Sequence, residues 1–179
     1  MFGGAISHSR RRAKLIIRRR QLFTPRRTGS GMVRFKNRYL LAELRWHDGR
    51  VDDTLSDAVL LGLLRQGVAL NFGDVSAGAA LASMAVKYWN PVTGLAIVRC
   101  GRDMHREVWA TMTLMREVKG RSVAVRVLHN GSTLRSSQQA ALTHSTDAYR
   151  SLVARGVVHE KASARGVSHA AVVIEGMQP

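Results

Sequence analysis

Residues 32–41 read Met-Val-Arg-Phe-Lys-Asn-Arg-Tyr-Leu-Leu, and the rest of the fold is predicted outward from this stretch. Apolar and basic side chains alternate along it: Val33, Phe35 and Tyr39 against Arg34, Lys36 and Arg38. A period of two predicts a β-strand with one buried face and one cationic face. The apolar run at 40–44 continues this strand into the core.

The chain beyond this strand alternates between helical and extended patterns. Turn and capping residues predict a helix from Asp52 or Asp53 to about Gly73, strands at 81–89 and 94–100, a helix from Asp103 to Gly120, a strand at 123–128, and a helix from Ser132 or Thr133 to about Leu152. This order predicts an α+β fold, ferredoxin-like or RRM-like. We expect a four-stranded antiparallel sheet with helices packed on one face, plus an extra C-terminal helix. The tail holds one more candidate strand, residues 170–174.

Composition divides the chain into three parts. Residues 1–31 carry nine Arg or Lys and no acid, and we expect this arm to be disordered unless a polyanion orders it. Residues 32–155 are the predicted folded domain, and residues 156–179 are a tail. The net charge of +16 indicates a polyanionic partner, nucleic acid or an anionic membrane surface, against the plainer alternative of a soluble basic protein.

The sequence lacks the patterns of an enzyme or a metalloprotein. No nucleophile elbow or phosphate-binding loop occurs, and adjacent His105, Arg106 and Glu107 point in different directions on a helix. Cys100 is the only cysteine, so an intrachain disulfide is excluded, and we expect a buried, inert thiol. We predict no catalytic residue, no metal site, no bound cofactor and no membrane span.

Nucleic-acid recognition is the alternative that the basic residues favour. The central strand 94–100 carries no aromatic side chain, so we do not expect bases to stack on it. We expect contact with the backbone of a folded RNA instead. Arg34, Lys36 and Arg38 recur about 6.5 Å apart along one strand face, which suits successive phosphates. A solvated edge strand protected by its charges is the competing interpretation.

The turn at 130–135 is the second candidate contact. Gly131, Ser132 and Thr133 lead into a helix whose N-terminus presents free N–H groups, and Arg135 lies one turn in. Simple helix capping by Ser132 or Thr133 explains the same residues. Lys87, Arg99 and Arg126 are predicted to extend a basic sheet face.

Three segments together resemble a known family. Residues 32–41, residues 86–100 (Val-Lys-Tyr-Trp-Asn-Pro-Val-Thr-Gly-Leu-Ala-Ile-Val-Arg-Cys) and residues 128–135 (Leu-His-Asn-Gly-Ser-Thr-Leu-Arg) closely resemble the Pop-five protein family, a small subunit of ribonuclease P and the related ribonuclease MRP. The likeness covers about residues 32–150. The chain departs from the family in its short, mildly basic C-terminus and in residues 1–31. These residues result from a wrongly assigned upstream start codon, or they are a transit peptide or an added RNA-binding arm.

The resemblance implies an RNA-binding, non-catalytic subunit in a ribonucleoprotein that matures precursor tRNA 5′ ends or, as ribonuclease MRP, processes rRNA. It implies contact with the ribonuclease P RNA, the MRP RNA or both. It also implies pairing with an Rpp-thirty-type subunit, only indirect contact with precursor tRNA, and Mg²⁺ held by the RNA. Nucleus and nucleolus are the implied location, or an organelle if residues 1–31 are a transit peptide. Two alternatives remain open: a basic ribosomal protein, and a protein-interaction module with an incidental basic face.

Overall fold

The first strand is buried on both faces and lies at the centre of the sheet. The computed structural model describes residues 36–178. In it, β1 (Asn37–Trp46) pairs antiparallel with β3 (Leu95–Gly101) on one side and with β5 (Arg121–Gly131) on the other. Tyr39, Leu40, Leu41 and Ala42 are all at most 4% exposed, because consecutive side chains point to opposite faces and both faces are covered.

The sheet has five antiparallel strands in the order β2-β3-β1-β5-β4. The four predicted strands are present as β1, β2 (Ala85–Asn90), β3 and β5. The two-residue β4 (Glu117–Val118) pairs with the start of β5 and was not predicted, since two residues leave no periodic signal. The α+β class is therefore confirmed, with one strand more than the four expected.

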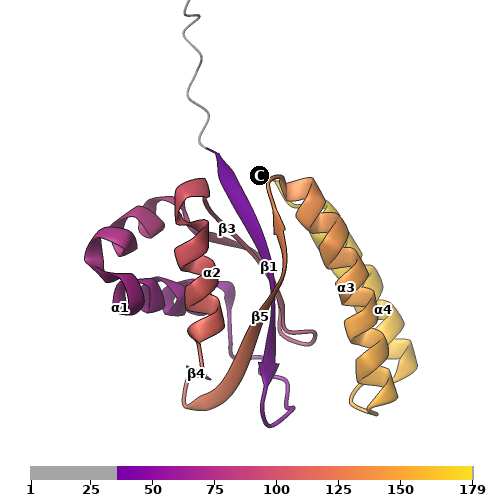
Figure 1. Ribbon diagram of the computed structural model, residues 1–179. Coiled ribbons are helices and arrows are strands. Elements are labelled where there is room, and N and C mark those ends of the chain that lie inside the picture. Colours follow the sequence, from indigo (N-terminus) through magenta and orange to yellow (C-terminus); the bar gives the residue numbers. More distant parts are fainter. Residues whose placement is uncertain (1–35, 179) are drawn as a thin grey trace, which may run out of the picture. The chain divides into compact units, whose positions relative to one another are not determined.

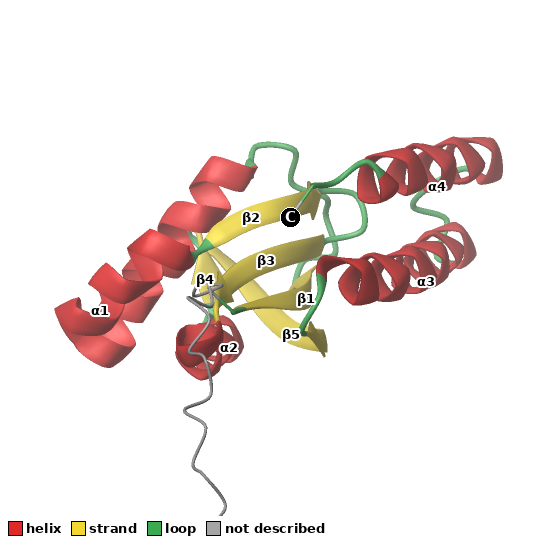
Figure 2. Ribbon diagram, turned by 90° about the horizontal axis from the view of Figure 1, so that it is seen from above, coloured by secondary structure: helices red, strands yellow, loops and turns green. Residues whose placement is uncertain are grey.

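Helices cover both faces of the sheet. The helices α1 (Asp57–Ser83) and α2 (His105–Leu114) lie on one side, and α3 (Leu134–Ala154) and α4 (Glu160–Glu175) lie on the other (Figures 1 and 2). The prediction that the first two helices pack on one face is confirmed, and the predicted extra helix is α3, which covers the other face together with α4, a helix that was not predicted. A sheet whose two central strands are apolar at both parities needs a second layer of helices to exclude water from its other face.

Two hydrophobic cores follow from this sandwich. Beneath α1 and α2, the core includes Leu40, Ala42 and Leu44 of β1 with Leu60 and Leu64 of α1. The second core lies beneath α3 and α4 and joins the sheet to both helices through Tyr39, Leu41, Ile97, Leu134, Ala141, Ala170 and Ile174. Successive residues of β1 thus belong to different cores.

Helix α1 is longer than the sequence predicted, and it is broken where the prediction ended it. Gly73 has φ 82° and ψ 177°, which no residue of an α-helix adopts, and helical backbone then resumes as far as Ser83. The expected strand at 81–89 accordingly starts only at Ala85. At the other end Ser56, rather than Asp52 or Asp53, caps the helix by accepting a hydrogen bond from the Val59 N–H at 3.4 Å.

Residues 170–174 lie in α4 and are not a strand. Ala170 and Ile174 are four residues apart and both buried, so they place one helical face against α3. The run of apolar residues was misread because an apolar run of five residues fits a buried strand and a helix equally well. Gly166 permits close approach of the two helices, since a Cβ there would lie 2.6 Å from the Tyr149 ring.

Arg121 joins β5 to the loop that follows β1. Its guanidinium stacks over the Trp46 ring, 4.2 Å from the centroid, and pairs with Asp48 at 2.8 Å and with Asp52 at 3.0 Å. Hydrogen bonds from the Thr54 hydroxyl and N–H, and then the pairing with Arg121, lower the pKa of Asp52. Asp52 therefore pairs with Arg121 in the loop and does not cap the helix, as the sequence had predicted it would.

The turn between β2 and β3 lies directly against β1. Gly94 has φ 69°, its N–H donates to Asn90 O at 2.8 Å, and its carbonyl accepts from Leu44 N at 2.8 Å. A Cβ at this position would overlap the Leu44 carbonyl oxygen. Gly94 is thus required both by its conformation and by its closeness to β1.

Replacing Gly94 with alanine should lower the free energy of unfolding by about 3 kcal/mol, because strain at positive φ and a backbone overlap act together. Urea denaturation followed by circular dichroism measures this decrease. The control is Gly120→Ala, where φ is 76° and no atom lies near the added carbon, and it should cost only about 1 kcal/mol. Equal decreases in the two variants would show that the close approach to β1 is not needed.

Candidate nucleic-acid interface

Strand pairing brings together the beginning of β1, the end of β3 and the end of β5. Asn37 lies opposite Gly101, and Tyr39 lies opposite Gly131. The Arg102 N–H donates to the Lys36 carbonyl at 2.8 Å, which fixes the short 3₁₀ turn η1 (Arg102–Met104) beside the start of β1. Residues distant in sequence therefore meet at this one end of the sheet.

These segments enclose an open hollow of about 420 Å³, which we call the β1 hollow. Its lining consists of Lys36, Asn37, Arg38, Tyr39, Arg102, Ser132, Thr133 and Leu134. Three cationic residues and the start of α3 thus line one concave surface, and no acidic residue among those that the structure describes lines it. Such a surface attracts an anion and offers hydrogen-bond donors to it.

The N-terminus of α3 is held in place by three contacts. Thr133 is the N-cap, and its hydroxyl accepts from Ser136 N at 3.3 Å. The Ser137 hydroxyl donates to Tyr39 O at 3.4 Å and joins the helix to β1. Gly131 is buried at the end of β5, and a Cβ at this position would meet Ser137 Oγ and His129 Nε2. Since Thr133 performs the capping, the exposed Ser132 hydroxyl remains accessible at the positive end of the helix.

The predicted contact residues fall into two groups. Lys36, Arg38, Ser132 and Thr133 meet at the β1 hollow, together with Arg102, which sequence reasoning missed because a single arginine after a strand carries no periodic signal. Arg135 is exposed in the first turn of α3, next to the hollow, and Gly131 precedes it. Arg34 lies outside the described residues.

Lys87 and Arg99 lie apart from the hollow. Arg99 follows Ile97 by two residues and so points to the sheet face that α3 and α4 cover, where it is half-buried. The Lys87 ammonium donates to the Gln178 carbonyl at 3.2 Å, just beyond α4. The open basic sheet face expected from the sequence is therefore covered by helices at these two positions.

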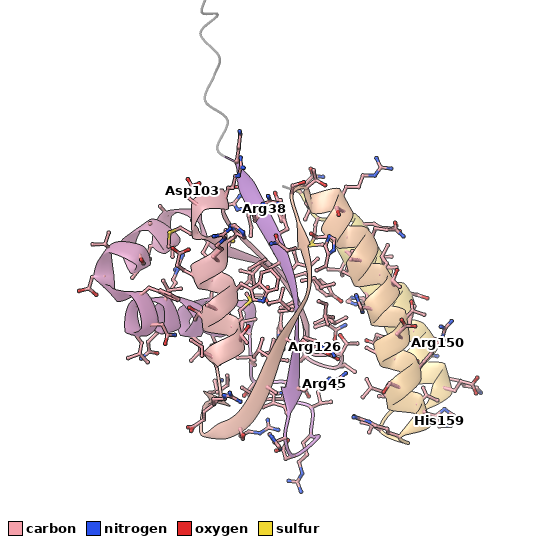
Figure 3. All side chains as sticks on the ribbon, in the orientation of Figure 1. Arg38, Arg45, Asp103, Arg126, Arg150 and His159 are labelled. Carbon is pink, nitrogen blue, oxygen red and sulfur yellow. The ribbon has the colours of Figure 1, made fainter. Side chains whose placement is uncertain are left out.

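Arg38 points to the other face of the sheet, toward Cys100 and Glu107. Figure 3 shows it at the beginning of β1, beside the turn that carries Asp103. Burial raises the pKa of the Cys100 thiol to about 12, although the nearby Arg38 charge opposes this rise. Cys100 is fully buried, so the thiol stays protonated and out of reach of solvent. Among residues 36–178, no group of three or more His, Cys, Asp or Glu side chains could hold a metal ion.

Comparison with known proteins places the chain in a family. The model of the Rpp14/Pop5 family matches residues 38–142, which include most of the β1 hollow. The chain belongs to the Rpp14/Pop5 family. This match excludes residues 1–37, so Lys36 and Arg34 precede the matched segment.

Particular relatives are similar over most of the folded part. The "Ribonuclease P/MRP protein subunit POP5" of Schizosaccharomyces pombe is 36% identical over 120 residues, which are 62% of this chain and 86% of that protein. The proteins of the same name from Mus musculus and Homo sapiens are 37% and 36% identical, each over 118 residues covering 64% of this chain and 70% and 72% of theirs. A chain in a structure titled "Cryo-EM structure of yeast Ribonuclease MRP" matches with a TM-score of 0.47 and 15% identity, over 57% of this chain and 78% of that one.

Replacing Thr133 with alanine should lower the free energy of unfolding by about 1 kcal/mol, because the N–H of Ser136 loses its partner. Thr133→Ser keeps the hydroxyl and should restore the stability. Ser132→Ala, one residue earlier, should leave it unchanged. Thermal melts of the three variants measure these changes. If Ser132→Ala were the most destabilising of the three, Ser132 and not Thr133 would be the cap.

Proposed function

We propose that this chain is an RNA-binding protein subunit of a ribonuclease P or ribonuclease MRP particle. The observation that carries the proposal is the β1 hollow, which is lined by Lys36, Arg38 and Arg102 together with the start of α3, in a chain of net charge +16. The relatives named above bear the name of such a subunit. The process served is then the 5′-end maturation of precursor tRNA, and in the MRP particle the processing of rRNA.

The protein's part in this function is to bind and hold the RNA, and cleavage belongs to the RNA with its Mg²⁺ ions. A phosphate in the β1 hollow receives charge-assisted hydrogen bonds from Lys36, Arg38 or Arg102 and further donors from the first turn of α3. These groups neutralise phosphates that would otherwise repel one another in a compact RNA fold. Arg38 lies in β1 and Arg102 in η1, and the Lys36 carbonyl accepts from the Arg102 N–H, so the backbone that carries these groups is already fixed.

We also infer that the sheet with α1 and α2 is RRM-like in arrangement but not in its mode of binding. The order β5-β1-β3-β2, with a helix after β1 and another after β3, supports this inference. An RRM stacks bases on aromatic residues of its open sheet face. Here β3 carries no aromatic residue, and α3 and α4 cover that face. Binding at the ends of the strands, through the RNA backbone, is the mode that remains.

A protein partner fits a different surface, on α1. Leu70 and Val75 are 85% and 90% exposed, and Leu81 is also exposed, on a helix that carries two acids and only one arginine. Helix α1 is long and apolar enough to resemble a membrane span, yet Leu60, Leu64 and Val68 bury one side of it against the sheet and Gly73 breaks it. Exposed apolar side chains on a weakly acidic helix of a basic chain favour a protein partner over RNA. We propose that it docks an Rpp-thirty-type subunit.

Location follows from the particle. The relatives named above come from eukaryotes, where such particles are nuclear, and we propose the nucleus and its nucleolus. An organellar location depends on residues 1–31, which lie outside the described residues. Sequencing the RNA that copurifies with the tagged full chain tests the whole proposal: ribonuclease P or MRP RNA supports it, and ribosomal RNA in ribosome-sized particles contradicts it.

Changing Lys36, Arg38 and Arg102 together to alanine should weaken binding to ribonuclease P RNA on the order of a hundredfold, because three cations that neutralise phosphates are removed. The slope of log affinity against log salt should fall by about 0.9 for each phosphate that is no longer neutralised, as measured by filter binding over a salt series.

The matched control changes Arg116, Lys161 and Arg165 to alanine. These three residues are exposed and do not line the hollow, so their substitution removes the same number and kind of charges at other places on the surface. Both variants should keep the wild-type melting temperature within a few degrees. Equal weakening in the two would mean that net charge alone, and not the hollow, binds the RNA.

Replacing Leu70 and Val75 with glutamine should raise the Kd for an Rpp-thirty-type subunit roughly tenfold or more, because two apolar side chains are removed from the interface. Affinity for RNA should not change. Val157→Gln with Val172→Gln, two other exposed valines, is the control. Isothermal calorimetry distinguishes the variants, and undiminished pairing of the α1 variant would place the partner elsewhere.

A further inference from the structure

A second concave site lies at the other end of β1. The last residues of β1, the turn between β2 and β3, and the second half of α3 enclose a cleft of about 350 Å³, which we call the α3 cleft. Figure 3 shows Arg45 and Arg126 together at this end of the sheet, on the side of α3 and α4. Arg38 and Arg45 are seven residues apart in one strand, so the two sites are separated by about 23 Å.

A carboxylate organises two arginines at the mouth of this cleft. Glu43 is only 13% exposed and pairs with Arg45 Nε at 3.1 Å and with Arg126 at 3.0 Å. The two arginine side chains are 65% and 64% exposed. A guanidinium has five N–H donors, so each retains donors after pairing with Glu43. The carboxylate therefore holds two guanidinium groups side by side and facing solvent.

The rest of the lining adds to the positive charge. Arg50 and Arg155 also line the cleft, while Asp147, its other acid, is paired with Arg150 at 3.4 Å. Four arginines thus meet two carboxylates, both of which are already paired. Thr93 also lines the cleft and is 8% exposed, and its hydroxyl has no hydrogen-bond partner among the described residues. A buried hydroxyl without a partner is costly, so a polar group that reached it from the cleft would gain a hydrogen bond.

The size and walls of the cleft select the kind of anion. Pockets of about 300–1,000 Å³ enclose ligand-sized groups, so one nucleotide fits this cleft and a double helix does not. Leu128 and Leu152 supply apolar wall for a base, while the arginines at the mouth suit a phosphate, which guanidinium groups bind through paired hydrogen bonds. An acidic peptide would satisfy the arginines but leaves no role for the apolar wall.

We propose that the α3 cleft binds one unpaired nucleotide of the RNA, with its phosphate on Arg45 and Arg126, and that Glu43 limits the affinity by competing for these two arginines. This inference rests on the proposed function, since it assigns a second binding site to the same RNA. The protein then joins two separate strands of the folded RNA, one at each end of β1.

The test uses the full chain and a short unstructured oligouridylate, with binding followed by fluorescence anisotropy. Arg45→Gln with Arg126→Gln should weaken binding on the order of tenfold and lower the salt slope by about 0.7 for each phosphate that is no longer neutralised. Glu43→Gln should tighten binding roughly threefold, because it frees both guanidinium groups. Arg116→Gln with Arg165→Gln is the control of equal charge. Melting temperatures establish that each variant is folded.

Opposite changes in the two cleft variants support the proposal, because a merely structural role for the ion pairs would weaken binding in both. Wild-type affinity in Arg45→Gln with Arg126→Gln, or weaker binding in Glu43→Gln, overturns it. Tighter binding of polyglutamate than of oligouridylate would assign the cleft to an acidic protein segment and also overturns it. If ribonuclease P RNA still binds the chain in these cases, the proposed function stands and only the cleft assignment fails.

Discussion

The burial of β1 on both faces is the constraint on which the rest of the structure depends. Two neighbouring strands pair with its backbone, and a pair of helices covers each of its faces. Alternate side chains of one strand therefore belong to two cores, so neither helical layer can shift without disturbing the other. Because the middle of the strand is enclosed in this way, its polar and charged residues can reach solvent only at its ends.

This enclosure explains where the candidate sites lie. In a sheet with one open face, a protein can bind a ligand along the strands. Here helices cover both faces, and the hollows occur where β1 emerges at each end, beside α3. The first end combines cations with a helix N-terminus, and the second combines arginines with apolar wall. The fold thus offers separated concave sites at the ends of β1 and leaves no open sheet face for continuous stacking.

Much of the sheet could be predicted from local pattern, and the packing of its second helical layer could not. The alternation at 32–39 and the turn at 90–93 predicted β1, β2 and β3 close to where they are found. Helix α3 was predicted as an extra helix, but α4 and the place of both helices on the sheet were not, because the signal is tertiary: apolar residues at both parities of β1 and β3. The segment 170–174 shows the same limit, since only the helix beginning at Glu160 decides that it is not a strand.

The candidate site was predictable only in part, for a related reason. Lys36, Arg38, Ser132 and Thr133 were chosen as two separate motifs, and strand register brings them together. Arg102 is brought to the β1 hollow by a backbone hydrogen bond to Lys36, which no sequence pattern predicts. Lys87 and Arg99 were expected on an open face that does not exist at their positions, because α4 and the packing of α3 on this face were not predicted.

The pleat of β1 also restricts how the distance between its two ends can vary among related chains. Inserting or deleting one residue between Arg38 and Arg45 would turn every later side chain to the opposite face and exchange the contents of the two cores. Only changes of two residues preserve the inward and outward pattern, and each alters the length by about 6.6 Å. Divergent sequences of this fold should therefore keep that interval constant, while insertions accumulate in the loops.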